Sequence, residues 1–241
     1  MNKRIVYPCV ARSAAGFISQ IVKYVQSGHY FYVRCLVPER KSSEHIDQKI
    51  LDLYDISRPR WRRERRNLKG SAGIHYLRYQ NLFVILVSKG RHDDFYRDHG
   101  DAALDIRRTA LKVFGYQIRH TYSRLEQRYR VFVRLDKEAE ATLRSHLLTI
   151  CTWETYREKL RIEREFQRLH WQPYGPVYQQ LYRIWKRVNR RRKAAGMELL
   201  HVSCIPKFRR LDKVFGNDNG DGESLQMASV KPSDWRGSCQ I

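Results

Sequence analysis

Apolar residues between Ser13 and Gly28 recur with the period of an amphipathic helix. They form one stripe, made of Phe17, Ile18, Ile21, Val22 and Val25. Ser13 is a residue type that caps helix N-termini, and Gly28 supplies a common C-terminal stop. The pattern therefore predicts a helix that packs one face against a core.

The segments that follow alternate between strand-like and helical patterns. Residues 30–37 are rich in aromatic and β-branched side chains and end before a proline, which predicts a strand. A second helix is expected over 43–55. Two further strand-like runs, 74–79 and 82–88, are separated by only two residues. Such a short connection predicts a β-hairpin.

The order of elements up to residue 136 matches a known sheet plan. A short helix is expected over 104–110, a strand over 111–122 and another strand over 129–135. The resulting order predicts an α+β fold with an antiparallel sheet core, and ferredoxin-like βαββαβ connectivity is the specific expectation. Residues 1–136 are therefore expected to form a sheet-containing α/β core domain.

Helical periodicity dominates from residue 137 onward, with helices expected over 139–150, 155–170 and 176–195. Thr155 and Glu158 fit a capping box, and Pro176 fits the first position of a helix. Residues 137–215 thus predict a basic helical C-terminal region packed on the core. Residues 216–241 are rich in Gly, Asn, Asp and Ser, which predicts a disordered tail.

The charge balance of the chain indicates the class of its partner. Lys and Arg number 47 against 25 Asp and Glu, a formal net charge of +22, and arginine supplies 33 of the 47 basic residues. No packed core needs this excess, and guanidinium groups match phosphate geometry in a bidentate way. Nucleic acid is therefore the expected partner, with DNA slightly preferred over RNA.

The same sequence argues against membrane insertion and export. The longest apolar run, Leu82–Val87, is far shorter than the roughly 20 residues of a membrane helix. Pro8 and Arg12 interrupt the N-terminal apolar stretch, which disfavours a secretory signal, and organellar targeting is not expected either. Five scattered cysteines without a C-x-x-C spacing suit reduced thiols. We expect a cytoplasmic, nucleoid or nuclear protein of undefined oligomeric state.

The densest basic segment spans residues 57–70. Ser57 as a cap and Gly70 as a terminator frame a helix, and Trp61 and Leu68, seven positions apart, are expected to anchor one edge of it to the core. Repulsion between the arginines lowers the stability of such a helix in isolation. Binding to a phosphate backbone would offset that repulsion. The expected nucleic-acid contacts here are Arg58, Arg60, Arg62, Arg63, Arg65, Arg66 and Lys69.

A second basic element is the helix expected from Pro176. Its apolar stripe consists of Val177, Leu181, Ile184, Trp185 and Val188. Basic residues occupy the other faces. Three interpretations are open: insertion into a major groove with Asn189 or an arginine reading bases, phosphate contact, and a solvated surface. The expected contacts on this helix are Arg183, Arg187, Arg190, Arg191 and Lys193. A third cluster close to the tail adds Arg209 and Arg210.

Segment 91–101 is the strongest candidate for catalytic chemistry. It follows a predicted strand and includes His92, Asp93, Asp94 and His99. Imidazole and carboxylate groups bind divalent metals, but the spacing matches no metal motif, and neighbouring arginines can pair with the carboxylates. We assign no catalytic residue and no metal ligand, and we expect no cofactor.

Tyr178 and Tyr182 place two hydroxyl groups one helical turn apart. The pair resembles the nucleophilic tyrosines of HUH-type replication and relaxase endonucleases. That family implies a metal held by a His-x-His pair on a central strand, and this sequence contains no such pair. The resemblance covers only a few residues and leaves a covalent tyrosine mechanism open.

These observations favour a nucleic-acid-binding protein that contacts the phosphate backbone through arginine clusters. One alternative is a metal-dependent nuclease or strand-transfer enzyme of a mobile element or plasmid. A second alternative is a basic structural component of a ribonucleoprotein assembly.

Overall fold

The computed structural model describes residues 7–153, 156–168, 174–205 and 213–216. The chain packs into two compact units. The first is formed by residues up to Leu104 together with those from Lys213, and the second by Asp105–Asp212. Domain boundaries at 136 and 215 stay predictions, because compactness alone does not say which segments fold independently.

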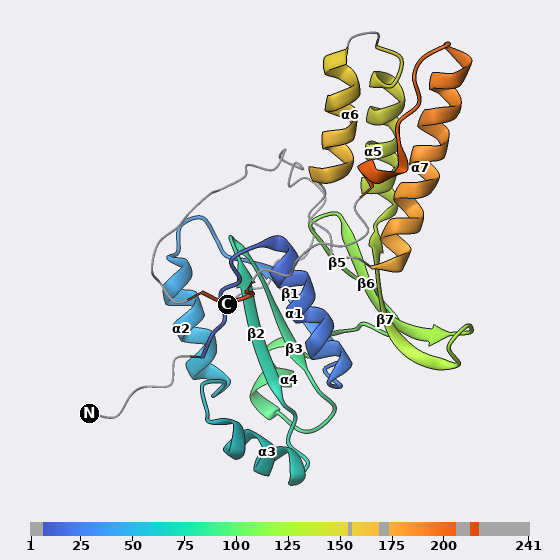
Figure 1. Cartoon of the computed structure of the whole chain (residues 1–241). Coiled ribbons are helices and arrows are strands. Elements are labelled where there is room, and N and C mark those ends of the chain that lie inside the picture. The colour runs from blue at the N-terminus through green and yellow to red at the C-terminus, as the bar shows by residue number, and fades with distance from the viewer. Residues whose placement is uncertain (1–6, 154–155, 169–173, 206–212, 217–241) are drawn as a thin grey trace. The chain divides into compact units, whose positions relative to one another are not determined.

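The first unit is built on a four-stranded sheet (Figure 1). Its elements are α1 (Ala14–Gln26), β1 (Phe31–Leu36), α2 (Ser43–Leu53), α3 (Arg60–Leu68), β2 (Ile74–Tyr79), β3 (Leu82–Val87), α4 (Asp93–His99) and β4 (Leu104–Asp105). The strand order in the sheet is β2-β3-β1-β4, and both β1 and β2 pair antiparallel with β3. The predicted first helix and the predicted hairpin are confirmed, and so is the α+β class.

Helices cover both faces of this sheet. Alternate residues of the strands, such as Val33 and Tyr76, belong to the core that also holds Ile50 of α2 and Phe95 of α4. The opposite face meets α1, where the Phe17 ring packs against Tyr79 at a centroid distance of 6.4 Å. Because both faces are covered, every residue of β3 is buried, which explains its continuous apolar run.

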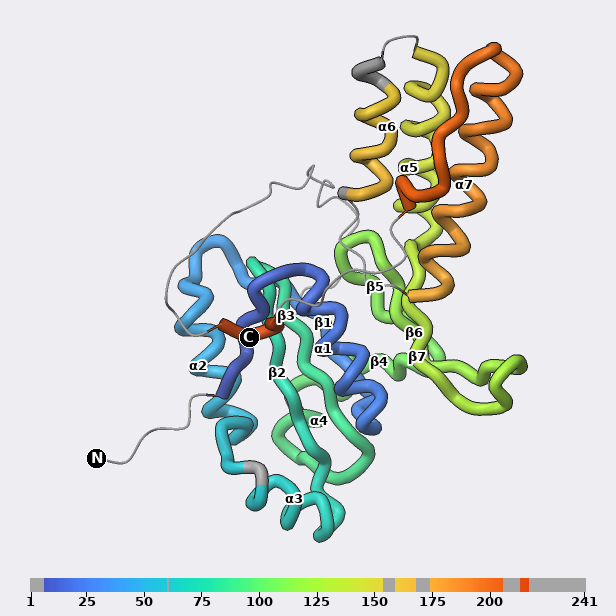
Figure 2. The backbone as a smooth tube through the Cα atoms, viewed as in Figure 1, coloured from blue at the N-terminus to red at the C-terminus, as the bar shows by residue number. Residues whose placement is uncertain are grey.

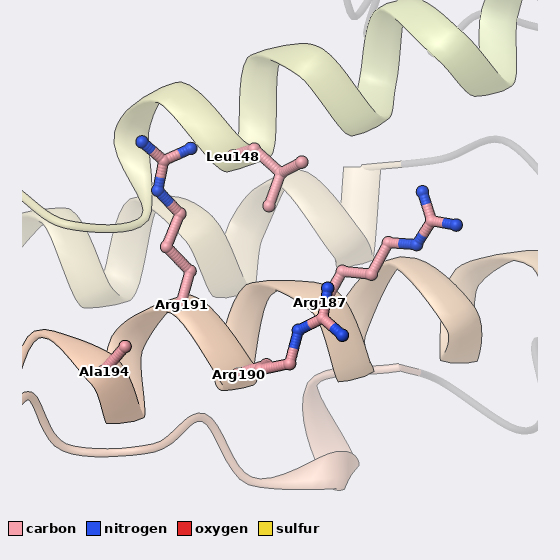
Figure 3. Close-up of a pocket in the computed structure, with 5 residues that line it drawn as sticks. All are labelled: Leu148, Arg187, Arg190, Arg191 and Ala194. Carbon is pink, nitrogen blue, oxygen red and sulfur yellow. The ribbon is translucent and has the colours of Figure 1, made fainter.

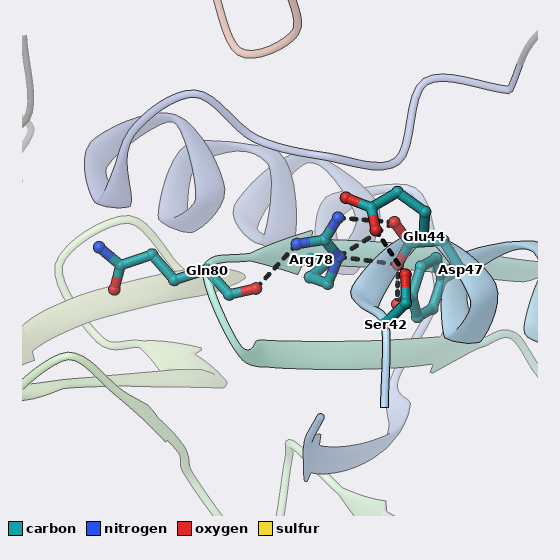
Figure 4. A network of polar contacts seen from close by, with 6 residues as sticks. Ser42, Glu44, Asp47, Arg78 and Gln80 are labelled. Carbon is teal, nitrogen blue, oxygen red and sulfur yellow. Dashed lines mark hydrogen bonds and ion pairs between the residues drawn. The ribbon is translucent and has the colours of Figure 1, made fainter. Parts of the chain in front are cut away.

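A buried ion pair joins α2 to β2 (Figure 4). Asp47 accepts hydrogen bonds from Arg78 Nε and Nη2, and the Nη2 distance to Oδ2 is 2.7 Å. Tyr76 Oη donates to the same carboxylate at 2.5 Å, and Arg78 Nη1 donates to the carbonyl of Gln80. This full set of partners offsets the cost of taking both charges out of water.

The predicted short helix over 104–110 is wrong. Leu104 and Asp105 form β4 at the edge of the sheet, and a turn follows in which Arg108 N and Thr109 N donate to Asp105 O. The Asp105 carboxylate accepts from Arg107 N at 2.9 Å, a local hydrogen bond that competes with helix formation. Strand β4, and not the strand predicted over 129–135, is therefore the last strand of the first sheet.

The second unit has its own three-stranded antiparallel sheet, in the order β5-β6-β7 (Figure 2). Its elements are β5 (Leu111–Val113), β6 (Tyr116–Ser123), β7 (Arg128–Leu135), α5 (Lys137–Ile150), α6 (Tyr156–Arg168), α7 (Gly175–Ala194) and the 3-10 turn η1 (Val202–Cys204). The single strand expected over 111–122 is split at Phe114 and Gly115, whose φ angles of 49° and 75° form a tight hairpin turn.

Side-chain amides attach α7 to its neighbours. Gln180 Oε1 accepts from Leu135 N at 2.9 Å, and its Nε2 donates to Leu135 O at 3.1 Å, which joins α7 to the end of β7. Asn189 forms the same two-bond arrangement with the backbone of Leu200. The predicted capping box at Thr155 lies outside the described residues. Among those that are described, no helix is long and apolar enough to cross a membrane.

After the second unit, the chain returns to the first. Arg12 N donates to Val214 O at 2.9 Å. Gly16 lies so close to this segment that a Cβ atom there would be 3.3 Å from the Cα of Val214. Of the tail predicted over 216–241, residues 217–241 lie outside the described part of the chain.

Candidate nucleic-acid interface

Three arginines of α7 line an open pocket of about 500 Å³ beside α5 (Figure 3). Arg187, Arg190 and Arg191 are spaced three and four positions apart, so they share one side of the helix. Leu148 of α5 and Ala194 complete the lining. The pocket thus combines a small apolar floor with three guanidinium groups.

The positive charge of this pocket is not compensated within α7. The helix has no acidic residue between Gly175 and Ala194. In the part of the chain that the structure describes, no carboxylate forms an ion pair with the three pocket arginines. Arg183 lies one turn before Arg187 on the same side of the helix and is exposed, and Lys193 is exposed as well. These groups are available to an external anion.

Arg192 lies within the same basic run but has a structural role. Only 3% of the residue is exposed. Its Nη1 donates to Cys151 O at 2.9 Å and its Nε donates to Glu198 O at 2.7 Å. The signal for this role was present in the sequence, because residue 192 continues the apolar stripe one turn after Val188.

Tyr178 and Tyr182 belong to an aromatic stack along α7. Their ring centroids are 6.2 Å apart, and the Tyr182 ring stacks on Trp185 at 5.3 Å. Lys186 Nζ lies 4.8 Å from the centre of the Tyr182 ring. Trp185 is half-buried, and its Nε1 donates to Leu200 O. The two tyrosines therefore form a stacked surface.

Helix α3 stands further from the core than the sequence predicts. The expected anchors Trp61 and Leu68 are 55% and 88% exposed. Ser57 is not the cap either, because the helix begins at Arg60 after Pro59. Two apolar residues in nine are too few for an amphipathic helix to bury a face. The anchoring expected for this segment is wrong.

The exposed Trp61 is flanked by guanidinium groups instead. Arg62 and Arg65 lie 5.1 and 5.7 Å from the centre of its ring, and both are exposed, as is Lys69. This arrangement combines an exposed aromatic ring with two cations. In a nucleic acid, the bases can stack on such a ring and the phosphates can pair with the cations.

Other predicted contacts on this segment have partners inside the protein. Arg58 forms an ion pair with Asp55, and Arg66 lies 3.9 Å from the same carboxylate. Arg63 turns toward the ring of Tyr7, with the guanidinium carbon 5.8 Å from its centre. The predicted residues that lie outside the described part of the chain are the Arg60 side chain, Arg209 and Arg210.

The candidate metal segment does not bring its ligands together. His92 and His99 are buried, and their rings contact the ring of Tyr54. His92 also caps α4 by accepting from Phe95 N. Among the described residues, no three His, Cys, Asp or Glu side chains gather in a way that could hold a metal ion.

A buried cluster of histidines and tyrosines joins α1 to β2. Tyr7 Oη is hydrogen bonded to His75 Nδ1 at 2.8 Å, and the Tyr24 ring stacks on His75 at 3.9 Å. His29 lies 4.6 Å from His75. Burial, reinforced by His29 and Arg63, lowers the pKa of His75 to about 3, and burial also lowers the pKa of His29. Both imidazoles are therefore neutral at pH 7.

A second basic surface, which the sequence reasoning missed, lies on the β5-β6-β7 sheet. Arg128, Arg130 and Arg134 alternate along β7 and are exposed. Alternation with period two is the signal that could have revealed them, because it places all three side chains on one face of a strand.

No protein-family model matches this chain, and neither a curated protein nor a solved structure shows significant similarity to it.

Proposed function

We propose that this chain binds nucleic acid, mainly through the phosphate backbone, and that α7 is a principal contact element. The observation that carries the proposal is the pocket lined by Arg187, Arg190 and Arg191, which have no carboxylate partner among the residues that the structure describes. Guanidinium groups in such a cluster repel one another, and a phosphate backbone offsets that repulsion by bidentate contacts.

Helix α3 offers a second contact surface of different character. Trp61 with Arg62 and Arg65 would combine base stacking with phosphate contact. Arg58 and Arg66 contribute less, because they share the Asp55 carboxylate. We therefore restrict the α3 contribution to Trp61, Arg62, Arg65 and Lys69.

We further propose that residues 31–105 are a ferredoxin-like βαββαβ module. The strand order β2-β3-β1-β4 and the helices between the strands support this assignment. Many nucleic-acid-binding modules of this plan use an open sheet face, whereas α1 covers that face here. The contact surfaces of the first unit are accordingly expected on α3.

One binding experiment separates this proposal from its alternatives. The purified full chain is incubated with labelled single- and double-stranded DNA and RNA, with and without Mg²⁺ or Mn²⁺. The proposal expects complexes without turnover, and affinity that falls linearly with salt on a logarithmic scale. Metal-dependent cleavage would instead favour a nuclease or strand-transfer enzyme, and the absence of any complex would contradict the proposal.

A further inference from the structure

The register of the β5-β6-β7 sheet separates its apolar side chains from its arginines. Cross-strand partners lie on the same face of a sheet, and successive residues along a strand alternate between the two faces. Leu111, Ile118 and Val133 therefore share one face, which is buried. The other face, which we call the basic face, carries four exposed arginines: Arg119, Arg128, Arg130 and Arg134.

Three of these arginines surround one aromatic residue. Phe132 is the cross-strand partner of Arg119, and Arg130 and Arg134 lie two positions before and after Phe132 on β7. Arg119 is thus a diagonal neighbour of both, at about 7–8 Å between backbones. Guanidinium groups at this spacing repel one another, and an anion bound among them would offset that repulsion.

Compensation of this charge within the hairpin is limited. Neither β6 nor β7 contains an acidic residue. Across the strands the arginines meet neutral partners, such as Gln117 opposite Arg134. Glu126 in the connecting turn forms ion pairs with Arg128 and Arg130. Both pairs are exposed, and exposed ion pairs contribute little to stability, so a phosphate group can take the place of this carboxylate.

The outer part of the β6–β7 hairpin is a two-stranded ribbon. Strand β5 pairs with β6 only as far as Ile118, whereas β6 stays paired with β7 from Arg119 to Ser123. This outer part spans about 17 Å, at about 3.4 Å for each residue. Near its base, His120 N donates to Ile106 O. Figure 2 shows the far end of the hairpin extending away from α5, α6 and α7.

The exposed tyrosines of the ribbon lie on the face opposite to the arginines. Tyr122 and Tyr129 are cross-strand partners, they share the face of Ile118, and their ring centroids are 5.4 Å apart. The aromatic residue on the basic face is Phe132, which is half-buried. The basic face therefore offers guanidinium groups and the Thr121 hydroxyl, and not the row of exposed rings on which unpaired bases stack.

We propose that the β6–β7 ribbon binds duplex DNA, with its basic face in the major groove. The major groove is about 12 Å wide and admits a two-stranded β-ribbon, and arginine and threonine can donate there to base edges and phosphates. The major groove of duplex RNA is deep and narrow, and side chains do not reach its bases. This inference rests on the proposed function and adds the substrate class.

The test compares four probes on the full chain: a duplex DNA, one of its single strands, the duplex RNA of the same sequence, and the duplex DNA with bulky groups on pyrimidine C5. These groups project into the major groove and leave the phosphates free. Thermal unfolding checks that each variant is folded, and little change is expected because the altered side chains are exposed.

Three variants accompany the parent. The ribbon variant changes Arg119, Arg130 and Arg134 to Gln. Tyr129→Ala alters the opposite face of the same ribbon. The charge-matched control changes three exposed cations of the first unit to Gln, namely Lys23, Arg40 and Lys49.

We expect the ribbon variant to bind duplex DNA at least about tenfold more weakly than the parent, and the two other variants to stay within about twofold. The parent should prefer the unmodified duplex DNA to the three other probes, and the C5 groups should weaken the parent more than the ribbon variant. An equal loss in the charge-matched control, parent binding that the C5 groups leave unchanged, or a parent preference for duplex RNA or the single strand would contradict the inference. A ribbon variant that binds like the parent overturns the inference alone, whereas a parent that binds no nucleic acid overturns the proposed function as well.

Discussion

Arg191 and Arg192 are neighbours in the chain, yet their side chains serve opposite purposes. The Arg191 side chain lines the open pocket beside α5, whereas Arg192 is buried and donates hydrogen bonds to the carbonyls of Cys151 and Glu198. The α-helical period of 3.6 residues separates adjacent side chains by about 100°, which is enough to place one outside and the other inside.

This relationship predicts opposite effects of two alanine substitutions. Arg192→Ala leaves the buried carbonyl of Cys151 and the partly buried carbonyl of Glu198 without their charged donor, so we expect the free energy of unfolding to fall by about 2–4 kcal/mol. Arg191→Ala should change it by less than about 0.5 kcal/mol and should weaken nucleic-acid binding instead. Denaturant unfolding and a binding titration on both variants measure this. A larger loss of stability in Arg191→Ala than in Arg192→Ala would contradict the assignment.

Because Asp47 and Arg78 form a buried ion pair, we expect the stability of the protein to depend strongly on the Asp47 carboxylate. Asp47→Ala removes the acceptor for both Arg78 and Tyr76 and leaves a guanidinium buried, so the expected cost is about 3–5 kcal/mol in the free energy of unfolding. Glu44→Gln on the same helix is the control, because Glu44 is exposed and its carboxylate accepts a hydrogen bond from the exposed Ser42 hydroxyl. A cost in Asp47→Ala no larger than in this control would show that the pair is not structural.

Acid should destabilise the first unit through His75. Its folded pKa of about 3 lies below the ordinary value of 6.5, so between these values only the unfolded chain takes up the proton. The contribution of His75 to the free energy of unfolding is therefore fully present above pH 6.5. Below that value it falls by about 1.4 kcal/mol for each pH unit. His29 acts in the same direction.

The measurement is the melting temperature between pH 7 and pH 4 for the parent, His75→Gln and the exposed-site control His146→Gln. His75→Gln should have a shallower dependence on pH than the parent, and the control should retain the parent's dependence. Identical curves for the parent and His75→Gln would exclude the role assigned to His75.

The return of the chain to the first unit predicts a sharp boundary for truncation. Ending the chain after Gly216 keeps the hydrogen bond from Arg12 N to Val214 O, and the melting temperature should hardly change. Ending it after residue 212 removes that acceptor and should cost about 1–2 kcal/mol. If both truncations unfold at the same temperature as the full chain, residues 213–216 contribute nothing to the fold.

The sequence was sufficient to predict elements whose side chains have an unambiguous period. The stripe that begins at Phe17 predicts α1, and the two-residue connection predicts the β2–β3 hairpin. Both predictions work because burial on one face or on both imposes a regular pattern of apolar residues on the sequence. The 104–110 segment failed for a local reason. Backbone hydrogen bonds to the side chain and the carbonyl of Asp105 hold the turn, and periodicity does not report such bonds.

The candidate site could be predicted only in part. The arginines of α7 follow from the apolar stripe opposite them, which is why Arg187, Arg190 and Arg191 are both predicted and found at one pocket. The basic face of β7 depends on strand register, a long-range property that pairs Arg134 with Gln117 and not with an acid. The buried cluster around His75 is likewise built from segments far apart in the chain.

The central claim is that arginines of α7 bind nucleic acid through phosphates, and the salt dependence of binding tests it most directly. Affinity of the parent and of the Arg187, Arg190 and Arg191 to Gln triple variant is measured at several salt concentrations on one duplex DNA. We predict a steep linear decrease of log affinity with log salt for the parent, and a slope shallower by about 2–3 in the variant, near 0.9 per lost contact. A parent slope near zero, or a variant slope equal to that of the parent, would contradict the account.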